Sequence, residues 1–196
     1  MATKSDFSEE QWRVLRDAPH LVVISMAAAG ASGIIGSLKE AFAPAGTMVA
    51  ALKGNNNLLK DVCNKDEMKA AVDALRGEIQ SPDLDTVRAY FRSSAITRVG
   101  EAIAILKEKG DMADCKAYAD FLMELADKVA KAAMEGGSFF GFGGVRVSEP
   151  EKALLADLEA AIAGTAEAPV AAAEAEAVPE EIPAEPEAEG GESSGG

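Results

Sequence analysis

APHLVVISMAAAGASGIIGSL, from Ala18 to Leu38, is the longest uncharged and apolar stretch of the chain. It reaches the roughly 20 apolar residues that a membrane-spanning helix needs. However, Gly30, Gly33 and Gly36 each lower the helix propensity by about 1 kcal/mol relative to alanine. No aromatic belt or Lys/Arg cluster flanks the stretch. We therefore expect a buried helix over 19–29, a Gly/Ser turn and a second helix over 32–43, with membrane association through residues 21–38 as the alternative.

The remainder of the chain divides into a body and an acidic tail. For 196 residues, one domain with an appendage is the natural expectation. After Gly164 no Lys, Arg or aromatic residue occurs, and nine of the 33 acidic residues lie between Glu167 and Glu192. Such a segment buries too little apolar surface to offset the entropy of ordering it. We predict an all-helical domain over residues 1–164 and a disordered Ala/Glu/Pro/Gly-rich acidic tail over residues 165–196.

The body is predicted to be all-α, because it is rich in alanine and shows little strand-like alternation. Ser8 with Gln11, and Ser148 with Glu151, have the spacing of capping boxes. Pro19 predicts the end of one helix and the start of the next, since proline suits a first helical turn and not an interior. Further helices are expected over 46–53, 66–77, 83–110, 111–135 and 149–163, with a loop at 54–57. Together these elements predict a compact bundle of seven to eight helices.

Composition argues against several classes of function. An acidic chain lacks the basic patch that binds nucleic acid. Cys63 and Cys115 are far apart in helical sequence, which predicts two reduced thiols in a cytoplasmic protein. His20 is the only histidine, so a His-rich zinc site is excluded and a Ser-His-Asp triad is hard to build. We expect a protein that is not an enzyme and has no cofactor.

Two local features are candidates for binding. The segment 136–144 holds five glycines and three phenylalanines, and Phe139, Phe140 and Phe142 form either an interaction loop or a plug for the core. Carboxylates are the second feature, and the candidate ligands for Ca²⁺ or Mg²⁺ are Asp127, Glu149 and Glu151. The alternative for these carboxylates is a solvated face, with the acidic residues near Glu149 complementing a helix N-terminus.

Two patches of the sequence resemble a known family. FSEEQWRVLRDAP at 7–19, followed by an apolar helix ending in AAAG at 27–30, resembles the opening of the bacterial tellurite-resistance B-like (TerB-like) helical proteins. The segment AKAAMEGGSFFGFGG at 130–144, with VSEPEK at 147–152, is similar to the closing part of related members. The resemblance implies an all-α fold with two similar halves, a link to stress responses and metal chelation by acidic residues, to which Glu149 and Glu151 correspond here.

These observations lead to one functional hypothesis and two alternatives. The hypothesis is a non-enzymatic binding or scaffolding protein that resembles TerB-like stress-response proteins. The alternatives are a divalent-metal-binding protein that uses acidic helix faces and a membrane-associated protein. We expect a cytoplasmic location, other proteins as partners, no nucleic-acid partner and the possibility of a homo-oligomer.

Overall fold

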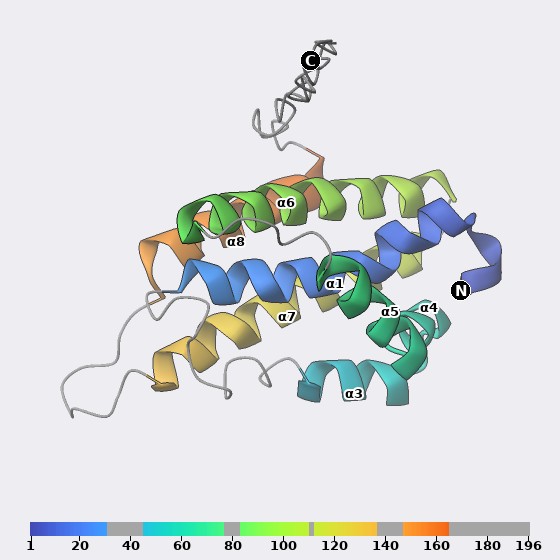
Figure 1. The fold of residues 1–196 in the computed structure, drawn as a ribbon. Coiled ribbons are helices and arrows are strands. Elements are labelled where there is room, and N and C mark those ends of the chain that lie inside the picture. Colours follow the sequence, from blue (N-terminus) through green and yellow to red (C-terminus); the bar gives the residue numbers. More distant parts are fainter. Residues whose placement is uncertain (31–44, 77–82, 110–111, 137–146, 165–196) are drawn as a thin grey trace, which may run out of the picture.

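The computed structural model of the chain describes residues 1–30, 45–76, 83–109, 112–136 and 147–164. Every regular element among them is helical, which confirms the predicted all-α class (Figure 1). The elements are a short 3-10 helix and seven α-helices: η1 (Lys4–Asp6), α1 (Glu9–Ala29), α3 (Ala45–Lys53), α4 (Asn57–Val62), α5 (Lys65–Arg76), α6 (Leu84–Glu108), α7 (Met112–Gly136) and α8 (Glu149–Ala163). The predicted helix over 32–43 and the predicted tail over 165–196 lie outside the described residues.

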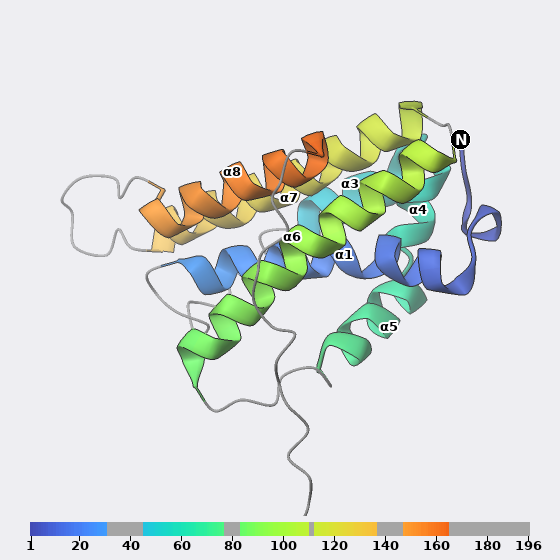
Figure 2. The same cartoon turned by 90° about the horizontal axis from the view of Figure 1, so that it is seen from above.

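Helix α1 lies at the centre of the bundle. It contacts α5, α6, α7 and α8, and in the view of Figure 1 α6 and α8 lie above it while most of α7 lies below it. Helix α7 also contacts α6 and α8. Seen from above, α6 and α7 run the length of the bundle, α8 lies along one half of it, and α5 lies beside the N-terminal part of α1 (Figure 2). Leu21, Val22 and Met26 of α1 are fully buried among these neighbours. The described part of the apolar stretch is therefore packed against protein, with Val23 and Ile24 only partly buried.

Small side chains allow α1 and α6 to approach closely. Ala18 on α1 and Ala95 and Ala102 on α6 are fully buried in the common core. The Ser25 hydroxyl donates a buried hydrogen bond of 2.7 Å to the carbonyl oxygen of Phe91. Since a buried hydroxyl without a partner costs free energy, this bond lets a polar residue occupy the helix interface.

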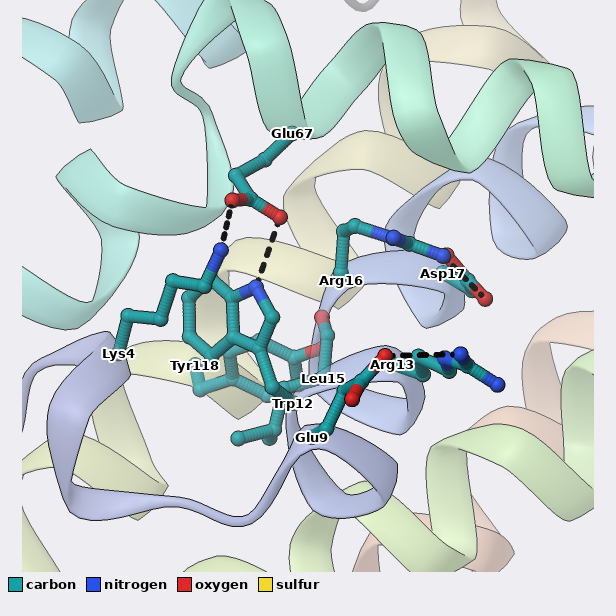
Figure 3. Close-up of polar contacts among 9 residues, drawn as sticks. All are labelled: Lys4, Glu9, Trp12, Arg13, Leu15, Arg16, Asp17, Glu67 and Tyr118. Atoms are coloured by element: carbon teal, nitrogen blue, oxygen red, sulfur yellow. Dashed lines mark hydrogen bonds and ion pairs between the residues drawn. The ribbon is translucent and has the colours of Figure 1, made fainter.

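The predicted helix break at Pro19 is wrong, because α1 continues through this residue from Glu9 to Ala29. Proline lacks an N–H, so the carbonyl of Leu15, four residues earlier, loses its helical donor. The hydroxyl of Tyr118 on α7 takes that place and donates a buried hydrogen bond of 2.6 Å to the Leu15 oxygen (Figure 3). Burial raises the pKa of Tyr118 well above its usual range, which keeps the phenol protonated and able to donate.

The other helix ends follow local sequence signals. Both predicted capping boxes are confirmed, with the Ser8 side chain accepting from the Gln11 N–H and the Ser148 side chain from the Glu151 N–H. Helix α4 was not predicted. Its N-cap is Asn56, whose side-chain oxygen accepts a hydrogen bond of 3.0 Å from the N–H of Leu59. The predicted loop at 54–57 is therefore shorter than expected, because the last two of its asparagines begin a short helix.

Within the described ranges, no helix has the length and apolar character required to cross a membrane. The half of α1 that follows Pro19 ends at Ala29, and the remainder of the apolar stretch, residues 31–38, lies outside those ranges.

Candidate binding recess

The carboxylates that were predicted to bind metal have other partners in the structure. Asp127 on α7 pairs with Lys131 at 2.5 Å, and Glu149 on α8 pairs with Lys152 at 2.6 Å. Glu151 is buried and accepts a 2.8 Å hydrogen bond from the Ser148 N–H as part of the helix cap. Among the described residues, no three Asp, Glu, His or Cys side chains gather as a group that could hold a metal ion.

The metal hypothesis therefore remains a prediction without support from these contacts. The other predicted site, formed by Phe139, Phe140 and Phe142, lies outside the described residues.

The histidine and the two cysteines are buried parts of the core. His20 lies within α1, and its Nδ1 has no hydrogen-bond partner among the residues that the structure describes. Burial lowers the pKa of His20, so the neutral imidazole is favoured. Cys63 and Cys115 are both free and buried, and burial raises the pKa of Cys63 to about 12. Since the thiolate is the reactive form, Cys63 is poorly suited to nucleophilic chemistry.

Three carboxylates fix the N-terminal segment to the bundle. Asp61 on α4 accepts a 2.9 Å hydrogen bond from the N–H of Lys4. Asp114 on α7 is fully buried and accepts a hydrogen bond from the N–H of Ala2. Glu67 on α5 forms an ion pair with the Lys4 ammonium group. These contacts join the N-terminal segment to three different helices.

Glu67 also binds the only tryptophan of the chain (Figure 3). The Trp12 indole N–H donates a hydrogen bond of 2.7 Å to one carboxylate oxygen of Glu67, and Lys4 binds the other oxygen. The Lys4 ammonium group lies 5.7 Å from the centroid of the Trp12 ring, within cation–π range. Residues Lys4, Trp12 and Glu67, which we call the N-terminal clamp, satisfy one another and act as a structural connection.

We expect the clamp to make stability depend on acid pH. Burial raises the pKa of Glu67, but the hydrogen bonds from Lys4 and Trp12 and the charges of Lys4 and Arg16 outweigh it, so the pKa lies below its ordinary value of 4.5. Folding then favours the ionised form, and this contribution is present above about pH 4.5 and lost as the pH falls through the folded-state pKa. The free energy of unfolding is measured by chemical denaturation at a series of acid pH values, with the fluorescence of Trp12 as the signal.

The variant Glu67→Gln should lack this part of the acid dependence, because its side chain does not titrate. Asp73→Asn removes an exposed carboxylate of the same helix and serves as the matched control. If both variants follow the acid profile of the unmodified chain, the clamp does not contribute to stability.

A pocket of about 630 Å³ opens beside the clamp, but its charges are mixed and already paired. Arg13 binds Glu9 at 2.9 Å, and Arg16 binds Asp17 at 2.7 Å (Figure 3). The lining carboxylates Glu9 and Glu67 offset two of its three cations. The third cation, Arg16, is held by Asp17 in a pair whose side chains are only 13% and 11% exposed, so this pocket offers little free charge to a ligand.

A second pocket in the described part of the chain has a different character. It is a recess of about 370 Å³ between the C-terminal end of α1, the N-terminal half of α6 and the first turns of α8. These three parts meet at the same end of the bundle (Figures 1 and 2). Its walls are mostly small and apolar, with Ala28, Ala29 and Leu154 among them. We call this pocket the arginine recess, because Arg88 and Arg92 are the charged residues among those that line it.

The two arginines occupy successive turns of α6 and so project from one face of it. Arg88 Nη1 binds Asp85 Oδ1 at 3.0 Å, in a pair whose side chains are 38% and 87% exposed. Arg92 pairs with Asp157, and these side chains are 38% and 41% exposed. Both acidic partners lie outside the recess lining. The lining itself therefore carries positive charge.

Arg88 is incompletely satisfied by the chain. Its Nε is buried and has no hydrogen-bond partner among the described residues. A guanidinium group presents several N–H donors in a fixed plane, suited to a carboxylate that accepts two parallel hydrogen bonds. Rotation of the side chain toward such a carboxylate would supply the acceptor that Nε lacks.

The predicted metal ligands Glu149 and Glu151 lie on the same first turn of α8 that borders the arginine recess. They flank Pro150, which lines the recess, and in the structure they contact Lys152 and Ser148 of their own helix end. Arg88 and Arg92 were missed. Their i, i+4 spacing was a readable signal, but a helical pair of arginines indicates a site only when the facing helices are known.

The described structure is thus an all-α bundle with an arginine-lined recess at one end. No protein-family model matches the chain, and no curated protein or solved structure shows significant similarity to it. The resemblance to the TerB-like family therefore remains a prediction, and the recess is the feature from which a function can be inferred.

Proposed function

We propose that the chain is a non-enzymatic binding protein whose arginine recess receives an acidic segment of a partner protein. The observation that carries the proposal is the lining of the recess, in which Arg88 and Arg92 stand among small apolar side chains. This arrangement suits a carboxylate with apolar neighbours. The proposal keeps the non-enzymatic binding or scaffolding role expected from the sequence, and the TerB-like resemblance would connect that role to stress responses.

The existing ion pairs do not prevent such binding. Exposed ion pairs contribute only about 0–1 kcal/mol to stability, because solvent and salt screen them. Exchange of Asp85 or Asp157 for an incoming carboxylate therefore costs little. A partner's carboxylate that binds the arginines inside the recess is partly shielded from water. A hydrogen bond to a charged group contributes about 1.5–3 kcal/mol.

The proposal is tested by the binding of an acidic probe to the full chain. The probe is a fluorescein-labelled peptide of ten glutamates, followed by fluorescence anisotropy, and a ten-glutamine peptide is its uncharged counterpart. We expect the double variant Arg88→Gln/Arg92→Gln to bind the glutamate peptide at least about tenfold more weakly, since about 1.4 kcal/mol corresponds to a factor of ten. The glutamine peptide should not bind measurably.

Arg98→Gln is the matched control. Arg98 is a partly exposed arginine of the same helix that pairs with Glu101 and does not line the recess. Arg98→Gln should change the affinity for the glutamate peptide by no more than about twofold. That small change is the long-range attraction that any surface cation exerts on the probe, and salt screens it. Equal losses in both variants would mean that the probe binds by general charge and would contradict the proposal.

A further inference from the structure

We propose that the chain's own acidic tail occupies the arginine recess through residues 178–183 and so competes with external partners. This inference rests on the proposed function, because it names a regulator of the same site. It is carried by the complementarity between the recess and this segment, and by the distance that the tail must cover.

Residues 178–183 read VPEEIP. The adjacent carboxylates of Glu180 and Glu181 equal the two guanidinium groups of the recess in number and carry the opposite charge. Val178 and Ile182 provide apolar side chains beside these carboxylates, as Ala28 and Leu154 do beside the arginines. The segment thus presents the chemistry that the proposed function requires.

Two prolines also reduce the cost of binding. Pro179 and Pro183 bracket the two carboxylates, and proline restricts the backbone toward an extended conformation. A segment that is already restricted loses less conformational entropy when it is fixed in a recess. Few contacts are then enough for weak, reversible binding.

The end of α8 allows the following chain to turn back toward the recess. Gly164 ends α8 with φ of 80°, a left-handed conformation that glycine adopts without strain and that redirects the chain. The recess residues Pro150 and Leu154 lie on the first turns of the same helix. At about 1.5 Å per residue, the recess lies roughly 15–21 Å from Gly164 along the helix.

The length of the connecting chain matches this span. Residue 178 follows Gly164 by fourteen positions. A random-coil chain of fourteen residues has an end-to-end distance of about 19–22 Å, from about 5–6 Å times the square root of the residue number. Because the effective concentration is highest when the linker length matches the span, the segment reaches the recess at about millimolar concentration.

The first experiment detects the intramolecular contact directly. A spin label is attached to Ala184→Cys in the full chain, and the broadening of amide signals is recorded by NMR. Cys63 and Cys115 are buried, so the introduced thiol reacts selectively. The amides of Ala89 and Leu154, at the recess, should broaden, while that of Ala71 on α5 should not.

The arginines and the ionic strength provide controls for this contact. The broadening should disappear in Arg88→Gln/Arg92→Gln and decrease in about 0.5 M salt, because screening weakens exposed charge pairs. Absence of broadening at Ala89 and Leu154, or broadening that persists without the arginines, would overturn the inference.

The second experiment separates this inference from the proposed function. It repeats the glutamate-peptide titration with Glu180→Gln/Glu181→Gln in the full chain. We expect the probe to bind about 3- to 10-fold more tightly, because an intramolecular competitor has been weakened. Glu185→Gln/Glu187→Gln removes the same charge from a neighbouring part of the tail and should change the affinity less than twofold.

The two failures give different results. If the probe binds through Arg88 and Arg92 with unchanged affinity in Glu180→Gln/Glu181→Gln, the inference is wrong and the proposed function stands. If the probe does not bind through the arginines even in that variant, both are wrong.

Discussion

Phe91→Ala should lower the free energy of unfolding by about 3–5 kcal/mol, because it truncates a large side chain that the core encloses. Phe91 is 1% exposed and lies on α6, the helix that packs against α1. Its removal takes a large apolar group from the core and leaves a cavity next to the central helix. Urea unfolding monitored by far-ultraviolet circular dichroism measures the change.

The matched control for this prediction is Leu84→Ala. Leu84 belongs to the same helix but is 53% exposed, and its truncation should change stability by no more than about 0.5 kcal/mol. If Phe91→Ala cost as little as Leu84→Ala, α6 would not pack against α1 as described.

Tyr118→Phe should cost about 1–3 kcal/mol, although it removes only one oxygen atom. The lost hydroxyl is the donor to the Leu15 carbonyl, which Pro19 leaves without its helical partner. The carbonyl would remain buried and unsatisfied at the centre of the bundle. Thermal unfolding of the two proteins measures the difference.

A double-mutant cycle with Pro19→Ala tests this explanation. Alanine restores an N–H at position 19, so the Leu15 carbonyl regains a helical donor and no longer depends on Tyr118. The cost of Tyr118→Phe should then fall below about 1 kcal/mol. An unchanged cost in the Pro19→Ala background would mean that the tyrosine stabilises the fold by another route.

Helix ends were predictable where their signals are local. The capping residues Ser8 and Ser148 act on backbone groups only three positions away, and both were identified from the sequence. The continuation of α1 through Pro19 was not predictable in this way. Its compensating donor is Tyr118, whose partner Leu15 is 103 positions distant in the chain and close only after folding.

In the candidate site too, local features could be predicted from the sequence and contacts between distant segments could not. The sequence indicates that Arg88 and Arg92 share a helix face, but it does not indicate that the end of α1 and the start of α8 face them. Conversely, the sequence predicted the contact of Glu151 with Ser148 in a capping box, whereas the ion pair of Glu149 with Lys152 is visible only in the structure. The sequence left open both a metal site and a helix-terminus role for these carboxylates, and the contacts in the structure are those of the second role.

The most direct test of the binding recess is an NMR titration of the full chain with the ten-glutamate peptide, following every assigned amide signal. We expect the largest shifts at the recess, at Ala28, Ala89 and Leu154, and we expect them to be lost in Arg88→Gln/Arg92→Gln. Shifts concentrated at the N-terminal clamp, around Lys4 and Trp12, or equal shifts over the whole surface would contradict the proposed function.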